Sequence, residues 1–169
     1  MVSSDQEKIN DFLQDYSRVR NLLIESGQFY LTKLGLSDVK INIQFYNAAP
    51  SSKGYFFGFV RLDVVPFEIM INCWHYGVDT ITLRVIECLI GRVDSPDKVL
   101  AHEISHIHQY VTSNLSLSNN RDICYNSKQF SRDLPYHERP WEQDAVSLSD
   151  KLYQEWLEEK DSARMTETV

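Results

Sequence analysis

The middle of the chain reads Leu100-Ala101-His102-Glu103-Ile104-Ser105-His106-Ile107-His108-Gln109. Just before it stand Asp94-Ser95-Pro96-Asp97, a combination typical of a helix start. A polar side chain can cap the helix, proline is tolerated in the first turn, and an acid suits the positive end of the helix dipole. Aliphatic residues follow at helical spacing: Leu100, Ile104, Ile107 and Val111. We therefore predict a helix that runs to about Val111 and packs its aliphatic side against the core.

Two histidines of this segment lie four residues apart. Residues at this spacing are about 40° apart around a helix axis, so the imidazoles of His102 and His106 can bind one ion. The same geometry places them roughly opposite the aliphatic side. Glu103 lies beside the pair, where its carboxylate can reach a water on the ion and act as a general base. The segment therefore predicts a metal site with a catalytic carboxylate.

The residues before this helix predict another helix and a small sheet. Apolar residues recur at steps of three and four from Asp5 to about Lys33, which indicates an amphipathic helix. Three β-rich runs follow at Val39–Tyr46, Tyr55–Leu62 and Phe67–Trp74. Pro66 precedes the last run and lacks an N–H donor, which favours an edge position for that strand. We expect a mixed or antiparallel sheet of at least three strands.

The rest of the chain predicts two further helices separated by a loop. Asp79 can cap a helix that ends at Gly91, although the β-branched residues there also suit a strand. Residues 113–134 are polar and lack a sustained period, which predicts a long loop. A last helix begins near Pro140, and a polar tail from Glu158 is expected to fray. The whole length of 169 residues suits one α+β domain.

The start of the last helix supplies candidates for a third metal ligand. Glu142 and Asp144 flank its apolar stripe about equally, so periodicity does not choose between them. His137 lies shortly before them. Either carboxylate, or this histidine, would complete a site with two histidines and leave a fourth position for water.

The segments L-A-H-E-I-S-H-I-H-Q and Y-H-E-R-P-W-E-Q-D-A together resemble the small zincins of the gluzincin kind. The resemblance covers about residues 96–112 and 136–152. It implies a zincin-like fold and a Zn²⁺ ion bound by His102, His106 and Glu142, the last through the E-x-x-A element of the family. It implies Glu103 as the catalytic base. An edge strand that holds the substrate extended would correspond to Phe67–Asn72.

One position departs from the pattern of the better-known gluzincins. An aspartate that braces a histidine often stands four residues after the third ligand in that family, and this chain has Val146 there. Asp144 is the alternative brace, or itself a ligand in place of Glu142. His137 also stays open as a ligand, since third-ligand histidines occur among zincins.

Other polar residues near the motif have separate expected roles. Stabilisation of an oxyanion requires a hydrogen-bond donor. Tyr110, Tyr136, His137 and Arg139 are candidates by position, with packing or surface pairing as the alternative for each. His108 points well away from the mean direction of the histidine pair, so we expect it to be structural.

Charge and cysteine content restrict the partners and the compartment. A net charge of −7 argues against nucleic acid and anionic membranes as partners. Three cysteines without a C-x-x-C pair indicate reduced thiols. The first fifteen residues lack the basic and apolar regions of a leader, and no stretch has the length of a membrane span. We expect a cytoplasmic protein.

These observations predict a zinc-dependent metallopeptidase that acts on a peptide or protein substrate. One alternative is a catalytically inactive zincin-fold module that binds zinc and regulates a partner. Another is a metal-assisted hydrolase that acts on a different substrate, which the net charge makes less suited to nucleic acid.

Overall fold

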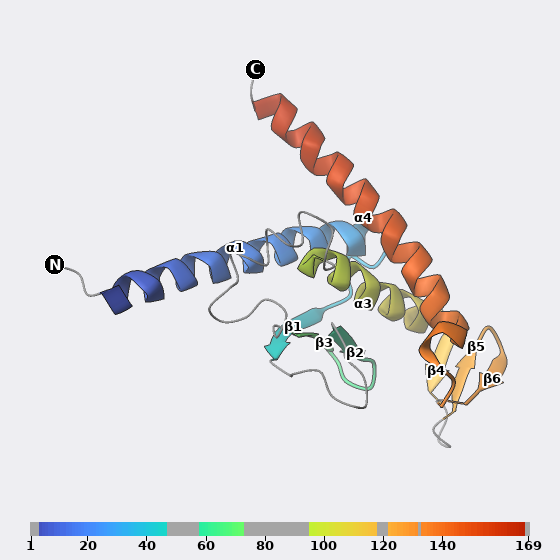
Figure 1. Ribbon diagram of the computed structural model, residues 1–169. Helices are drawn as coiled ribbons and strands as arrows, with labels where there is room; N and C mark the ends of the chain where they lie inside the picture. The colour runs from blue at the N-terminus through green and yellow to red at the C-terminus, as the bar shows by residue number, and fades with distance from the viewer. Residues whose placement is uncertain (1–3, 47–57, 73–94, 118–121, 132, 168–169) are drawn as a thin grey trace.

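The computed structural model describes residues 4–46, 58–72, 95–117, 122–131 and 133–167. Within them the chain forms three α-helices and two small three-stranded sheets, an α+β fold that confirms the predicted class (Figure 1). The helices are α1 (Ser4–Lys33), α3 (Pro96–Val111) and α4 (Pro140–Glu167). None of them is both long and apolar enough to cross a membrane. The helix predicted between Asp79 and Gly91 lies outside the described residues.

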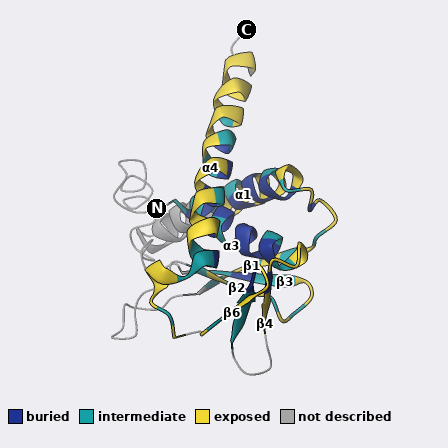
Figure 2. Cartoon of the chain, turned by 90° about the vertical axis from the view of Figure 1, so that its right-hand side faces the viewer, coloured by how far each residue is buried: buried dark blue, intermediate teal, exposed yellow. Residues whose placement is uncertain are grey.

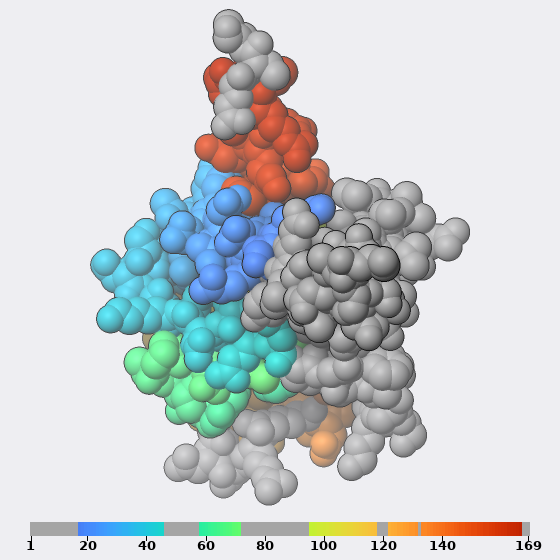
Figure 3. Space-filling view, turned by 90° about the vertical axis from the view of Figure 1, so that its left-hand side faces the viewer, coloured from blue at the N-terminus to red at the C-terminus, as the bar shows by residue number. Residues whose placement is uncertain are grey.

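The first sheet is mixed, one of the two forms predicted. Its strands are β1 (Ile41–Tyr46), β2 (Gly58–Arg61) and β3 (Phe67–Asn72), in the order β1-β3-β2. β3 runs parallel to β1 and antiparallel to β2. On one face of the molecule α1 lies against β1, and α4 rises beyond them (Figure 3).

The prediction that Pro66 places its strand at an edge is wrong. β3 is the central strand of the three, and β2 is an outer strand that contacts α3. Pro66 stands one residue before β3, and the Phe67 N–H donates to the Lys40 carbonyl oxygen at 3.2 Å. The N–H that proline lacks therefore falls outside the ladder, so a central position costs no hydrogen bond.

The core lies where α3 meets the other helices and the first sheet. Leu100, Ile104 and Ile107 are fully buried, as the aliphatic spacing predicts, and α3 is the most deeply buried helix (Figure 2). They belong to one cluster with residues of α1, α4 and β3. Val111 is the exception, with 44% of its surface exposed, because the helix ends there.

A buried polar cluster ties the first turn of α3 to α4. The Ser95 hydroxyl donates to Asp97 and does not cap a backbone N–H. The indole N–H of Trp156 donates to the other Asp97 oxygen at 3.1 Å. Because a buried carboxylate needs donors, this cluster fixes where α4 crosses the start of α3. Asp94, the other predicted capping residue, lies outside the described residues.

The predicted loop at residues 113–134 contains a second sheet. Its antiparallel strands are β4 (Leu115–Leu117), β5 (Ile123–Tyr125) and β6 (Lys128–Phe130). Strands of three residues are too short for alternation to stand out in the sequence. The turn between β5 and β6 has positive φ at both Asn126 and Ser127, a combination that suits a two-residue hairpin. Leu115 and Tyr125 of this sheet bury Trp141 at the start of α4.

The helix continues through the segment where a polar tail was expected, because α4 ends at Glu167. Trp156 is its last buried residue, and the helix beyond it extends away from the core (Figures 1 and 2). This end carries Glu158, Glu159, Lys160, Ala163 and Arg164, residue types with high intrinsic helix propensity.

The Asp97 cluster predicts a stability loss for Trp156→Phe. The variant keeps most of the packed ring but leaves one Asp97 oxygen buried without its donor, so the free energy of unfolding should fall by about 1–3 kcal/mol. Urea denaturation measures this change. The exposed Gln154→Ala on the same helix is the control and should stay within about 0.5 kcal/mol of wild type. Equal stabilities for the two variants would contradict the role of the cluster.

Candidate metal centre

The two histidines of α3 face each other at the surface of the core. Their Nε2 atoms are 3.2 Å apart, and the ring planes are nearly perpendicular. The aliphatic side of α3 anchors the helix, so the opposite side presents both rings toward α4. The convergence predicted from the four-residue spacing is present in the structure.

Glu142, in the first turn of α4, completes a cluster with these histidines. Its Oε2 lies 3.3 Å from His102 Nε2 and 3.2 Å from His106 Nε2. One atom from each of the three side chains falls within 4.8 Å of the other two, so the group could hold a metal ion. The Glu142 side chain is only 13% exposed.

The other two candidate ligands lie elsewhere. Asp144 is exposed and accepts a hydrogen bond from the Tyr125 hydroxyl. The His137 side chain is 81% exposed and lies 3.5 Å from a Glu138 oxygen. The structure therefore brings Glu142, and neither alternative, to the histidines. The ligand role of the three residues stays a prediction.

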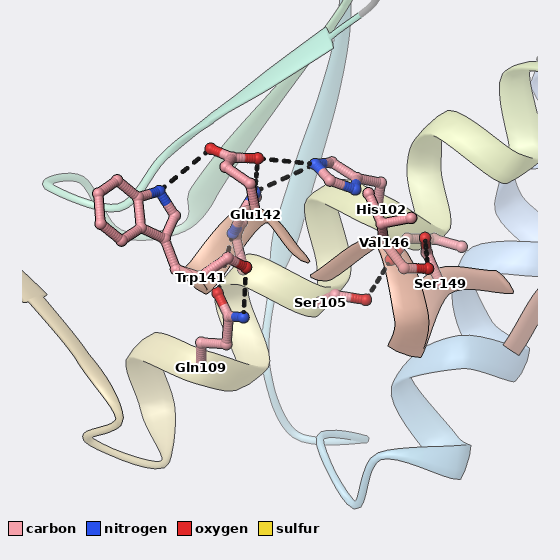
Figure 4. A network of polar contacts seen from close by, with 9 residues as sticks. His102, Ser105, Gln109, Trp141, Glu142, Val146 and Ser149 are labelled. Carbon is pink, nitrogen blue, oxygen red and sulfur yellow. Dashed lines mark hydrogen bonds and ion pairs between the residues drawn. The ribbon is translucent and has the colours of Figure 1, made fainter. Parts of the chain in front are cut away.

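A hydrogen-bond network that the sequence did not reveal surrounds the cluster (Figure 4). The indole N–H of Trp141 donates to Glu142 Oε1 at 3.1 Å. Gln109 contacts His106 Nδ1 through Oε1 at 2.9 Å, and its Nε2 donates to the Trp141 carbonyl oxygen at 2.9 Å. Asp144 therefore does not brace a histidine here. The sequence feature that could have indicated a contact between Gln109 and His106 is their spacing of three residues, which places both on the same side of the helix.

The charges of the cluster stabilise one another. Burial alone would raise the pKa of Glu142, but hydrogen bonds from His102 and His106 hold it well below its usual value. Burial lowers the pKa of His106, and the hydrogen bond and charge of Glu142, with the charge of Glu103, raise it overall. These shifts favour a negative Glu142 beside a protonated imidazole. A divalent cation would take the place of such protons.

Glu103 lies next to the cluster and is almost fully buried. Burial raises the pKa of its carboxyl, against the lowering effect of the two histidines. Gly58, the first residue of β2, passes close by, and a Cβ there would lie 3.2 Å from Glu103 Oε1 and 2.9 Å from Val99 Cγ1. Only glycine allows this approach without displacing a neighbour. Gly58 is a second site residue that sequence patterns did not indicate.

The position of β2 corrects the assignment of the edge strand. The strand matched to a substrate-holding edge, Phe67–Asn72, is central. In the described sheet β2 is an outer strand, and its residues Gly58, Phe59 and Val60 line the cavity beside the cluster. An extended chain beside the site would therefore lie along β2.

A cavity of about 950 Å³ opens in front of the cluster. Of the candidate oxyanion donors, Tyr136 and Arg139 line it. Burial and the nearby Glu142 raise the pKa of Tyr136, which keeps its hydroxyl protonated. Tyr110 instead packs edge-on against the Phe67 ring at 5.9 Å. His108 is partly buried and lies outside the cluster, as expected.

Comparison with known protein families, curated proteins and solved structures finds no match to this chain. The resemblance to the gluzincins therefore stays a prediction from the two motif segments.

The geometry predicts different effects for the two acids of α4. Glu142→Ala removes a candidate ligand and should weaken zinc binding by more than the roughly 10–100-fold typical of changes around a ligand. Asp144→Ala is the matched control and should keep one zinc ion per chain. Metal analysis of the purified proteins and competition with a chelator measure both. Full zinc retention in Glu142→Ala would refute the proposed ligand set.

Proposed function

We propose that this chain is a small zincin-like zinc metallopeptidase that hydrolyses peptide bonds. The observation that carries the proposal is the cluster of His102, His106 and Glu142, with Glu103 buried directly beside it. Two imidazoles and one carboxylate are a ligand set of catalytic zinc sites, which keep a fourth position for water. When bound, zinc would lower the pKa of that water.

The proposal assigns the role of proton carrier to Glu103. It neighbours His102 in sequence, is not part of the ligand cluster, and reaches the wall of the cavity. Its carboxylate would take the proton from the attacking water and pass it to the leaving amine. Tyr136, on the cavity wall, carries a protonated hydroxyl suited to stabilise a developing oxyanion.

β2 offers a way to hold the substrate. It is an outer strand of the described sheet, and Phe59 and Val60 also line the cavity. An extended peptide can add to such a strand through main-chain hydrogen bonds. A strand of this kind suits a peptide or protein substrate, which is the substrate class that the resemblance to gluzincins implies. The cytoplasmic location stays a prediction.

The role of Glu103 can be tested with Glu103→Gln. The variant keeps the three candidate ligands, so zinc content should be unchanged, while loss of the base should lower the rate of casein hydrolysis by about 10²–10⁴-fold. Glu138→Gln, which changes an exposed acid outside the cavity lining, is the matched control and should keep full activity. Cleavage of unfolded casein with and without chelator, beside metal analysis, measures both properties.

Two outcomes would redirect the proposal. A Glu103→Gln protein that binds zinc and keeps every biological effect would identify an inactive zinc-binding or regulatory module. Chelator-sensitive cleavage of nucleic acid but not of casein would identify a hydrolase of a different substrate class.

A further inference from the structure

Gln109 connects His106 to the start of α4. Its Oε1 lies 2.9 Å from His106 Nδ1, and its Nε2 lies 2.9 Å from the Trp141 carbonyl oxygen. Gln109 is almost fully buried, so little water is available to replace either contact. Both hydrogen bonds must therefore be satisfied within the protein.

The direction of these hydrogen bonds follows from the Trp141 carbonyl, which can only accept. The NH₂ group of Gln109 must face it, which turns Oε1 toward His106. Because Oε1 is also only an acceptor, His106 Nδ1 must carry the proton. The reversed amide would place two buried acceptors against each other and leave both without a donor.

The proton on Nδ1 determines what the other ring nitrogen can do. In the neutral ring Nε2 carries a lone pair, and this atom faces Glu142 Oε2 at 3.2 Å and His102 Nε2 at 3.2 Å. Nε2 is therefore the atom offered to an ion, and the ring cannot rotate without breaking its bond to Gln109.

Trp141 supports a second ligand through its side chain. While its carbonyl anchors Gln109, its indole N–H donates to Glu142 Oε1 at 3.1 Å. This contact occupies the outer carboxylate oxygen and leaves Oε2 toward the histidines. Trp141 is itself fixed in the small core with Leu115 and Tyr125.

We propose that Gln109 is a positioning residue of the metal centre. Anchored by the Trp141 carbonyl oxygen, it holds His106 as the Nδ1–H tautomer and directs Nε2 at the ion. The inference rests on the metal-binding part of the proposed function and is independent of peptide hydrolysis.

The test replaces Gln109 by methionine, which keeps the length of the side chain and removes both hydrogen bonds. In wild type, the His106 Nδ1–H proton should exchange slowly in NMR spectra of the zinc-loaded and the metal-free protein. In Gln109→Met this protection should disappear. Zinc dissociation constants, measured by competition with a chromophoric chelator, should rise about 10–100-fold.

Gln143→Met is the matched control. Gln143 also donates from its amide to a backbone carbonyl, that of His137, at 2.7 Å, but does not contact a histidine ring. This control should keep wild-type zinc affinity and His106 protection. A folded Gln109→Met protein with the affinity and protection of wild type would overturn the inference.

Gln109→Glu provides a test that does not depend on the folding of the methionine variant. A protonated carboxyl at this position can donate to the Trp141 carbonyl oxygen and still accept from Nδ1, so His106 protection and zinc binding should persist. A His106 ring without a proton on Nδ1, in metal-free Gln109→Glu or wild type, would contradict the proposal. If wild type bound no zinc, the proposed function and the metal-positioning role would both fail, while the Nδ1–H signal of the metal-free protein would still decide whether Gln109 sets the His106 tautomer.

Discussion

The contact between the first turn of α4 and the stretch of α3 from His102 to Gln109 is the constraint on which the candidate site depends. It holds a Glu142 oxygen within 3.3 Å of two imidazole nitrogens, in a region that is mostly shielded from water. Groups that offer lone pairs repel one another at such distances unless protons or a cation lie between them. The arrangement persists because apolar burial and the Trp156 contact with Asp97 hold the two helices together.

The second sheet contributes to this contact from outside the main core. Leu115 and Tyr125 enclose Trp141, and Trp141 links to His106 through Gln109 and to Glu142 directly. A segment that is polar and aperiodic in sequence thus sets the start of α4. Its strands are short, but they contribute to the site because they enclose the indole of Trp141.

Sequence patterns predicted the elements whose signal is long and local. The periodicities of α1, α3 and α4 span several turns, so their existence and the start of α4 are confirmed. Prediction failed where an element has only a few residues, or where its position depends on residues far away in the sequence. Three-residue strands show no period, the central place of β3 depends on its pairing with β1 and β2, and α4 continues past Glu158 without core contacts.

The sequence by itself determined that His102 and His106 converge, because residues four apart share one side of any helix. It also determined that the opposite side of α3 is apolar. It restricted the candidates for the third metal ligand to a few side chains near Pro140. Only the tertiary structure decided among them. Glu142 lies 40 residues from His102 along the chain, so their distance depends on how two helices cross. The same crossing places Gln109 against the Trp141 carbonyl and leaves Asp144 outside, and no local periodicity contains that information.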